Sequence, residues 1–447
     1  MRVLQCNDSF RPIMDGVGVC VENYARHLGL LGHQVAVAAP WAPVDPDKSG
    51  ENGGSTGGNG GHDGADSAGP GDDEANDPFE LFRYASIPLP GWKPYRLGVP
   101  RLDFSFYTRL DRWIDEALDA GAGAAGSQRR LQIVHSHSPF VAGKLGQRLA
   151  RRHGALHVTT FHSKYRDDFM KSVPSNKLAR LFVRRIVRFY ESADAVWTPS
   201  EATAETLRSY GFSGEVTVMP NGADLDPPDE ASYEEYRRRG ADILGVAPSS
   251  PSEGSEEDAG VEGGPFILLF VGQHRWEKNL RLVIDGLAEL SSEVAGNVRA
   301  VFAGTGSDAK DIEAYAKKRQ VSKLCDFRGL VLDREILKAL YARADLFMFP
   351  SLYDNAPLVL REAAAFQTPA VLAAGSSAAA DTEDGRNAFH VNPEPESLAK
   401  LIVTLSGDAE TVNRVGRRAQ EEVYCGWREI VAEVADLYEA LLAARRG

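Results

Sequence analysis

The segment at residues 272–279, Gly-Gln-His-Arg-Trp-Glu-Lys-Asn, gathers side chains that suit an anionic ligand. It directly follows an apolar run at 266–271 and opens a stretch with helical spacing. A helix N-terminus attracts phosphate through its free amides, while Lys278 adds a point charge and Arg275 a planar fork. The segment therefore predicts a diphosphate clamp, with a solvated helix start as the plainer alternative.

Two carboxylates follow a later apolar run that ends at Phe349. Asp354 falls in the expected loop, and Glu362 falls about a turn and a half into a helix whose first turn suits Pro357. A buried carboxylate needs hydrogen-bond donors, and hydroxyls of a sugar and a ribose would supply them. An acid that stabilises the helix dipole is the alternative, which explains Asp354 but leaves Glu362 unexplained.

Histidines end two further apolar runs, as His135-Ser-His137 and as Thr160-Phe161-His162. At the mouths of adjacent strands they would meet and could donate to a phosphate or a sugar hydroxyl. His162 is the strongest catalytic candidate, His137 is assigned to the acceptor side, and His135 is expected to point into the fold. A purely structural role is the alternative for each.

A glycine-rich turn, Asp15-Gly16-Val17-Gly18, lies between the first expected strand and the first expected helix. Glycine lets a backbone approach a ligand closely, so Gly16 is a donor-binding candidate; a simple tight turn is equally compatible. The dinucleotide fingerprint is incomplete because position 21 is Val, which disfavours NAD.

Short apolar runs alternate with amphipathic helices throughout the chain, which predicts parallel sheets covered on both faces. Two such series predict an α/β protein with two doubly wound, Rossmann-like domains. The expected strands are 2–6, 35–39, 131–136, 156–161, 195–198 and 216–219, then 266–271, 300–303, 324–327, 346–349 and 370–372.

The net charge of -13 is concentrated in two segments. Residues 45–80 hold ten acids against one lysine, and residues 246–264 hold five acids and no base, so the remainder is nearly neutral. The Gly-, Asp- and Ser-rich stretch 45–77 and the similar stretch 247–264 cannot offset their ordering entropy by burial. Both are predicted to be disordered.

These patterns predict the domain boundaries. We expect a first domain at 1–225 with the insert 45–77, a partly disordered linker at 226–264, and a second domain at 265–426. The amphipathic segment 427–447 either packs on the second domain or crosses back to the first.

Composition excludes several classes of protein. No apolar run approaches 18 residues, and the segment MRVLQCN lacks the pattern of a signal peptide, so a cytoplasmic protein is expected. The four cysteines are scattered without a CxxC pair, which makes a zinc site improbable. No cofactor and no nucleic-acid partner are expected.

The order of the motifs resembles family four of the retaining glycosyltransferases, which have the GT-B fold of two Rossmann-like domains facing a central cleft. The matching segments are VHSHSP, TFHSK, ADAVWTPSEATAETL, VMPNGADLD, VGQHRWEKNL, VFAGTGSD, FRGLV and PSLYDNAPLVLREAAAFQTPAV. They span nearly everything except the two acidic stretches. The resemblance implies a metal-independent transferase that takes its sugar from a nucleotide-diphosphate donor.

The resemblance also implies roles for individual residues. Gly16 is similar to the element that faces the diphosphate, and His162 to the histidine beside the reacting centre. Lys278 matches the diphosphate-binding lysine, while Asp354 and Glu362 match the acids that contact the donor sugar and the ribose. The loop residues Asn355, Ala356 and Pro357 are expected to complete the donor site.

Two departures from the family pattern concern the donor site. Gln273 stands where the family usually has arginine, and Arg275 is a hypothetical substitute for its charge. Asp354 is one methylene shorter than the usual glutamate. Asp224-Leu-Asp226 has the spacing of a metal-binding DxD, but it lies in the PNGADLD segment, and metal binding there is not expected.

The acceptor is expected to meet the first domain, where residues 176–192 form a basic amphipathic helix. Arg180, Arg184 and Arg188 share one face, which suits an anionic lipid surface and a lipid or glycolipid acceptor. An ordinary sheet-covering helix is the alternative. A nucleotide-sugar epimerase and an inactive sugar-nucleotide sensor are the rival functions.

Overall fold

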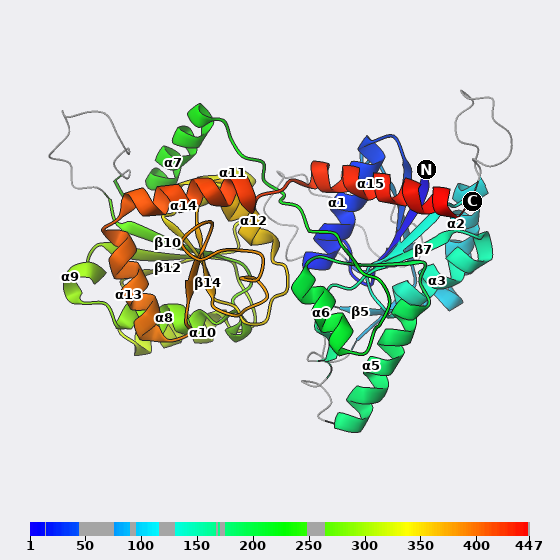
Figure 1. Ribbon diagram of the computed structural model, residues 1–447, viewed down its shortest axis with the longest axis horizontal. Coiled ribbons are helices and arrows are strands. Elements are labelled where there is room, and N and C mark those ends of the chain that lie inside the picture. Colours follow the sequence, from blue (N-terminus) through cyan, green and yellow to red (C-terminus); the bar gives the residue numbers. More distant parts are fainter. Residues whose placement is uncertain are drawn as a thin grey trace, which may run out of the picture. The chain divides into compact units, whose positions relative to one another are not determined.

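The computed structural model describes residues 1–13, 15–43, 76–89, 95–115, 130–166, 169, 175–247 and 264–445. It divides into two compact units, each with its own parallel sheet (Figure 1). The first unit comprises Met1–Met219 and Trp427–Gly447, and the second comprises Pro220–Gly426. The predicted fold class, two α/β domains with parallel sheets, is confirmed.

The first unit has a seven-stranded parallel sheet in the order β3-β2-β1-β6-β7-β8-β9. Its strands are β1 (Arg2–Cys6), β2 (Gln34–Pro40), β3 (Glu80–Tyr84), β6 (Ile133–Ser136), β7 (Leu156–Thr160), β8 (Ala195–Thr198) and β9 (Thr217–Val218). The short strands β4 (Ser86–Pro88) and β5 (Arg96–Gly98) pair antiparallel. Its helices are α1 (Gly16–Leu30), the 3-10 turn η2 (Pro100–Leu102), α2 (Phe104–Asp115), α3 (Val141–His153), α5 (Asn176–Glu191), α6 (Glu201–Ser209) and α15 (Trp427–Ala444).

Burial explains why these segments form strands. All five residues of β1 are buried, and Val3 pairs with Val35 on one side and Ile133 on the other, so β1 is central. Strands buried on both faces appear as continuous apolar runs, which is how the sequence predicted them. Side-chain caps fix the helix starts: the Asp15 carboxylate accepts from the Gly18 amide at 2.8 Å, and the Ser200 hydroxyl accepts from Thr203.

The second unit has a six-stranded parallel sheet in the order β12-β11-β10-β13-β14-β15. Its strands are β10 (Phe266–Val271), β11 (Val298–Ala303), β12 (Cys325–Gly329), β13 (Leu346–Phe349), β14 (Ala370–Ala373) and β15 (Phe389–Val391). Its helices are α7 (Glu230–Leu244), the 3-10 turn η3 (Trp276–Lys278), α8 (Leu280–Ala288), α9 (Ser292–Ala295), α10 (Ala309–Lys318), α11 (Arg334–Arg343), α12 (Leu358–Ala365), α13 (Pro395–Ser406) and α14 (Ala409–Glu422). Helices α8 and α10 lie on one side of this sheet, and α11 and α12 on the other (Figure 1).

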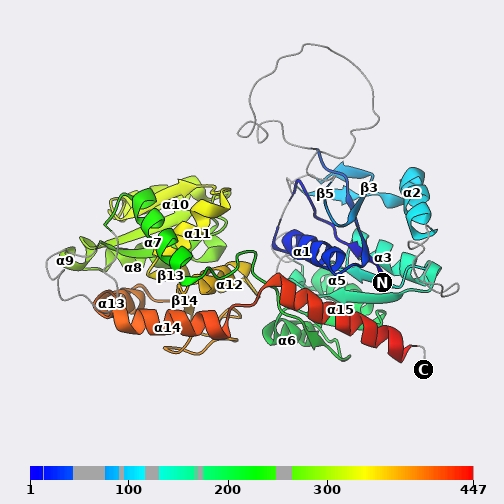
Figure 2. The same ribbon diagram turned by 90° about the horizontal axis from the view of Figure 1, so that it is seen from above.

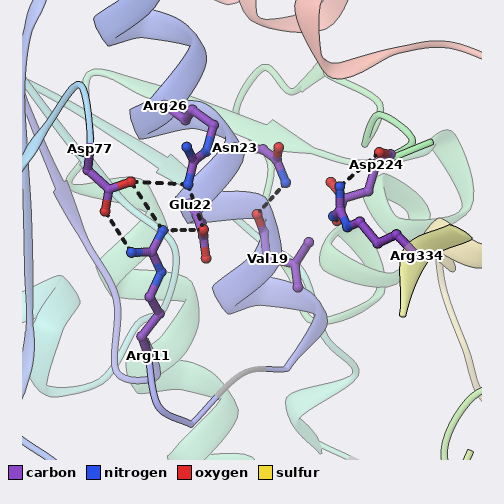
Figure 3. A network of polar contacts seen from close by, with 8 residues as sticks. All are labelled: Arg11, Val19, Glu22, Asn23, Arg26, Asp77, Asp224 and Arg334. Atoms are coloured by element: carbon purple, nitrogen blue, oxygen red, sulfur yellow. Dashed lines mark hydrogen bonds and ion pairs between the residues drawn. The ribbon is translucent and has the colours of Figure 1, made fainter. Parts of the chain in front are cut away.

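The predicted disordered insert 45–77 needs a correction at its end. Residues 44–75 lie outside the described part of the chain, but Asp77 is described and its side chain is only 6% exposed. Arg11 contacts it at 2.6 Å and Arg26 at 3.1 Å, and both arginines also reach Glu22 of α1 (Figure 3). Because charged groups are buried only when they are paired, this network fixes the chain where it enters β3.

The predicted linker 226–264 differs from the structure as well. Residues from Pro220 onward belong to the second unit, and α7 packs against α11 there (Figure 2). The Asp229 carboxylate caps the start of α7 through the Ser232 amide, and Gly245 ends it in the left-handed conformation. The second acidic stretch lies outside the described residues between 247 and 264.

Helix α15 belongs to the first unit, one of the two placements that the sequence left open. It packs beside α1, and Trp427 contacts the Tyr24 ring edge-on at 6.0 Å. Tyr438 stacks on Trp197 of β8 at 5.4 Å and its hydroxyl is 2.6 Å from Nδ1 of His135. The helix therefore completes the core beneath the histidines of the first unit.

Candidate functional site

Lys278 and Asp354 meet at the carboxyl ends of β10 and β13, which are neighbours in the sheet. Their Nζ and Oδ1 atoms are 2.5 Å apart, and both side chains are about one-fifth exposed. The Ser351 hydroxyl donates to the other Asp354 oxygen at 2.6 Å. The pair is therefore a partly enclosed, oriented charge pair at the edge where parallel sheets bind ligands.

The helix start predicted for this segment is displaced. Residues 276–278 form the 3-10 turn η3, and α8 begins only at Leu280. Asn279 lies between them in the left-handed conformation, with φ of 57°, and its amide donates to the Pro350 carbonyl at 3.1 Å. Lys278 is thus positioned by a turn fastened to the loop after β13, and not by the first turn of a long helix.

Arg275, which was expected to supply a charge to the clamp, has an acidic neighbour in the same loop. Its guanidinium lies 3.2 Å from Glu277 and is about half exposed, while Gln273 is exposed in the same loop. The loop backbone is fixed by the segment after β11, since the His274 amide donates to the Thr305 carbonyl at 3.0 Å. A Cβ at Gly304, where φ is 142°, would meet the Gly272 carbonyl oxygen at 1.9 Å, so only glycine fits there.

Glu362 lies on α12, where its carboxylate accepts a hydrogen bond from the Tyr341 hydroxyl at 2.9 Å. Burial raises the pKa of Glu362 to about 7, an effect that the Tyr341 hydrogen bond opposes. A ligand hydroxyl that donates a hydrogen bond to the carboxylate would stabilise its charged form against this effect of burial. The hydroxyl-binding role of this side chain stays a prediction.

The loop between Asp354 and α12 is partly buried. Asn355 is buried, and the Ala356 carbonyl accepts from the Asn221 amide at 3.3 Å. Pro357 occupies the N-cap position of α12, one residue before the first turn where it was expected. The three predicted loop residues therefore lie beside the charge pair in sequence and begin the helix that carries Glu362.

The two acids of the DxD-like segment are engaged by neighbouring side chains. Arg334 contacts Asp224 at 3.2 Å, and the Tyr424 hydroxyl donates to Asp226 at 3.0 Å. The pair Asp224–Arg334 appears on the right of Figure 3. Each acid therefore has a neighbouring partner of its own, and the expectation that this segment binds no metal stays a prediction.

In the first unit the predicted histidines do come together. Nδ1 of His137 lies 3.1 Å from Nε2 of His162, and the two rings stack with centroids 5.4 Å apart. His137 is completely buried, whereas His162 is partly exposed. Burial lowers the pKa of His162 to about 4 and the pKa of His137 well below its usual value. Both imidazoles are therefore neutral at pH 7 and act as hydrogen-bonding groups.

His135 points into the fold as expected, between Tyr438 and Thr160 at 2.6 and 2.7 Å. Gly16 is exposed at the first position of α1, and a Cβ there would meet nothing within 4 Å. The fold itself therefore gives no reason for glycine at position 16. This leaves close approach of a ligand as the remaining prediction for it.

The basic helix α5 carries its arginines on an exposed face. Arg180, Arg184 and Arg188 are all exposed. Two of them border a pocket of about 670 Å³, which is lined by Arg166, Ala179, Arg180, Val183, Arg184, Ser209 and Tyr210. Within the described residues, no helix is both long and apolar enough to cross a bilayer.

Sequence reasoning missed Asp8, which lies two residues after the end of β1. The Asp8 carboxylate accepts hydrogen bonds from the Ser138 hydroxyl and from the Ala142 amide, the latter at 3.0 Å, so Asp8 caps the start of α3 from the loop after β1. Its position just beyond a strand was the available signal. Tyr341, the partner of Glu362, is 21 residues away in the sequence and only the folded chain brings the two together, whereas Ser351 is three residues from Asp354 and was overlooked.

Family models match most of the chain. The model described as Glycosyltransferase Family 4 matches residues 14–227, and the model described as Glycosyl transferases group 1 matches residues 252–422. One similar protein is an alpha-monoglucosyldiacylglycerol synthase from Acholeplasma laidlawii, 22% identical over 94% of this chain and 92% of its own length. Another of that name, from Streptococcus pneumoniae, is 28% identical over 83% of this chain and 70% of its own.

Solved structures share the fold. The Anabaena protein HepE in complex with UDP-glucose superposes with a TM-score of 0.66 at 16% identity, covering 98% of this chain and all of its own. Sucrose-phosphate synthase from Thermosynechococcus elongatus gives a TM-score of 0.67 at 17% identity, covering 99% of both chains.

Proposed function

Because the chain belongs to glycosyltransferase family 4, we propose that it transfers a hexose from a nucleotide-diphosphate donor to an acceptor hydroxyl with retention of configuration. The observation that carries this proposal is the contact between Lys278 and Asp354 where β10 and β13 end. A diphosphate that enters there exchanges one anionic partner of Lys278 for another. The freed Asp354 carboxylate then accepts hydrogen bonds from sugar hydroxyls.

Glu362 binds the ribose in this proposal. Its neighbour Tyr341 holds the carboxylate in one orientation, and the partly buried setting strengthens hydrogen bonds from ribose hydroxyls. The chain approaches the diphosphate through the Gly272 loop and through Asn355, Ala356 and Pro357. Gly16 of the first unit adds a backbone that can approach phosphate closely, and Gln273 and Arg275 line the outer part of the loop.

The proposed reaction uses the leaving group as its base. The acceptor hydroxyl attacks on the face from which the diphosphate departs; the new C–O bond forms as the bond to phosphate breaks, and the phosphate oxygen takes the hydroxyl proton. Electrostatic stabilisation by Lys278 supplies most of the acceleration, so neither a protein base nor a metal ion is required. His162 is neutral and hydrogen-bonds the reacting sugar. His137, on the acceptor side, holds the His162 imidazole in place.

We further propose a lipid acceptor, reached from the cytoplasmic face of an anionic membrane. The names of two relatives, both monoglucosyldiacylglycerol synthases, support a diacylglycerol-type acceptor and a glucosyl donor. The exposed Arg180, Arg184 and Arg188 support attraction to anionic lipid, since each basic residue near such a surface contributes about 1 kcal/mol.

One assay tests the reaction and separates its rivals. Donor screening by thermal shift comes first, because a nucleotide sugar at about 100 times its Kd stabilises the protein by about 2.7 kcal/mol. The best donor is then incubated with diacylglycerol in mixed micelles, and NMR of the product reports the anomeric configuration. An inverted product contradicts retention. Donor binding without transfer to a broad acceptor panel favours the sensor that the departures at Gln273 and Asp354 suggest, and conversion without acceptor favours an epimerase.

Membrane attachment is tested by co-sedimentation with vesicles of neutral and of anionic lipid. We expect the double variant Arg180→Gln/Arg184→Gln to lose binding to anionic vesicles. The matched control, Lys177→Gln/Arg185→Gln, removes two exposed charges from the same helix outside the pocket. Equal binding by both double variants would contradict a role for the pocket arginines.

A further inference from the structure

Cys20, His137 and His162 converge on one point of the first unit. The Cys20 sulfur and one nitrogen of each imidazole all lie within 4.8 Å of one another. They come from three separate segments: helix α1, the end of β6 and the end of β7. For this reason the sequence, which has no paired cysteine motif, made a metal site look improbable.

The distance between the two imidazoles suits a shared ion. A tetrahedral ion with Zn–N bonds of about 2.0–2.1 Å holds two nitrogen ligands roughly 3.3 Å apart. Nδ1 of His137 and Nε2 of His162 are 3.1 Å apart in the structure. The Cys20 sulfur lies within 4.8 Å of both nitrogens, and a third bond of about 2.3 Å would draw it toward the ion.

Buried neighbours already fix His137 as a metal-binding histidine is normally fixed. Its Nε2 lies 2.8 Å from the Gln5 carboxamide oxygen, so Nε2 carries the proton and the lone pair of Nδ1 faces His162. A metal-binding imidazole usually donates its other N–H to an oxygen acceptor in this way. The Tyr24 ring packs edge-on at 5.5 Å and holds the imidazole plane.

We propose that Cys20, His137 and His162 bind a thiophilic divalent cation such as Zn²⁺, with the fourth coordination position open, and that the bound ion inhibits transfer. One thiolate and two imidazoles are a set of ligands that favours Zn²⁺ over harder cations such as Mg²⁺ and Ca²⁺. Binding expels the thiol proton to solvent as the Zn–S bond forms, and the proton between the two imidazoles moves from Nε2 to Nδ1 of His162, which frees the Nε2 lone pair for the ion. Inhibition rests on the proposed function, since the bound ion would hold the His162 imidazole, which that proposal assigns to the sugar.

Cobalt tests the site without reference to activity. Metal-stripped, full-length protein is titrated with Co²⁺, and we expect one ion per chain, visible d–d bands of a tetrahedral complex and a near-ultraviolet thiolate charge-transfer band. The variant Cys20→Ser should lose the charge-transfer band, whereas Cys325→Ser, in the other unit, should keep it. The absence of that band from the parent protein, or its persistence in Cys20→Ser, overturns the proposal.

A second variant keeps the test valid if Cys20→Ser folds poorly. Gln5→Leu removes the oxygen that orients His137 and leaves all three ligands in place. We expect it to retain the charge-transfer band while its Co²⁺ affinity falls about 10- to 100-fold, as for other residues that orient a ligand. Unchanged affinity contradicts the proposed geometry.

The inhibitory step has its own readout. Zn²⁺ should inhibit transfer by the parent protein and by Cys325→Ser, with recovery on addition of EDTA, but should inhibit Cys20→Ser much less. If no transfer is detected at all, the proposed function fails while the cobalt spectra still decide the site. If the spectra appear and Zn²⁺ leaves transfer unchanged, the inhibitory part of the proposal is wrong.

Discussion

At the carboxyl ends of the seven-stranded sheet the gathered side chains are imidazoles, whereas at the corresponding edge of the six-stranded sheet they are an ammonium group and carboxylates. His135 and His137 are buried and contact neutral groups, namely the hydroxyls of Tyr438 and Thr160, the His162 imidazole and the Gln5 carboxamide, in contrast to the ion pair of Lys278 and Asp354. The same sheet architecture thus supports a neutral centre in one unit and a charged centre in the other. This division suits a donor that carries phosphate and an acceptor that carries only a hydroxyl.

The largest effect should come from the charged centre. We expect Lys278→Ala to lower kcat by about 10²–10³, the loss typical when one electrostatic contact to a developing charge is removed. The matched control is Lys338→Ala, which removes a lysine of the same unit that pairs with Glu335. Steady-state kinetics with the preferred donor measure both variants. If Lys278→Ala were as active as the control, the proposal that Lys278 stabilises the diphosphate of the donor would be wrong.

The second comparison concerns the nucleotide. Glu362→Gln should raise the donor KM about 10- to 100-fold, because a hydrogen bond to a charged group contributes about 1.5–3 kcal/mol. The acceptor KM should stay unchanged. Glu421→Gln, an exposed glutamate on α14, controls for the loss of one negative charge. Equal changes in both KM values would contradict a role specific to the donor.

The two centres should respond to acid in opposite directions. Burial lowers the pKa of His162 and of His157, which lies on β7, to about 4. Between pH 6.5 and 4 the unfolded chain therefore binds more protons than the folded chain, and the free energy of unfolding decreases as the pH falls. By pH 5 each histidine should cost about 2 kcal/mol. The raised pKa of Glu362 has the opposite sign, because its neutral form is favoured in the folded state and stability rises as pH falls through 7.

Differential scanning calorimetry at pH 7.5 and pH 5 measures this contrast. We expect the transition of the first unit to move to lower temperature at pH 5 relative to that of the second. The variant His157→Gln should reduce the difference, because it removes one group that must be protonated. A parallel shift of both transitions would show that the histidine centre does not dominate acid sensitivity.

The smallest effect tests the network of the first unit alone. Asp77→Ala leaves the Arg11 and Arg26 charges partly unpaired and should lower the free energy of unfolding by about 1–2 kcal/mol. Glu201→Ala, which breaks an exposed pair with Arg208, should cost less than about 1 kcal/mol. Chemical denaturation of both variants ranks them. Equal losses would mean that burial of Asp77 adds nothing.

The strands that sequence patterns predicted well are those buried on both faces. Strands β8, β10 and β13 fall at the expected residues because uninterrupted apolar runs leave little ambiguity. Strand β3 escaped prediction because Glu80 and Arg83 interrupt its pattern at the edge of the sheet. Helix α7 escaped because its many charged residues resembled a linker, although its buried residues pack on α11.

The site residues likewise fall into those that the sequence suggested and those that it did not. Residues in the segments after strands, such as His162, Lys278 and Asp354, were proposed from position, because the carboxyl ends of parallel strands converge. Tyr341 and Asp8 were not found, because they act through contacts between segments far apart in the sequence, and Ser351 was overlooked although it lies three residues from Asp354. Arg275 pairs with Glu277 two residues away, and its proposed role in the clamp stays a prediction. The roles proposed for these residues remain predictions.

The placement of α15 in the first unit bears on the order in which the protein can mature. A nascent chain that has passed Met219 contains every strand of the seven-stranded sheet, yet His135 still lacks Tyr438 and Trp197 lacks the ring that stacks on it. The ribosome must synthesise all of the second unit before α15 can dock. The histidine centre is therefore completed after the charged one, so a truncated translation product would lack the contacts of Tyr438 with His135 and Trp197.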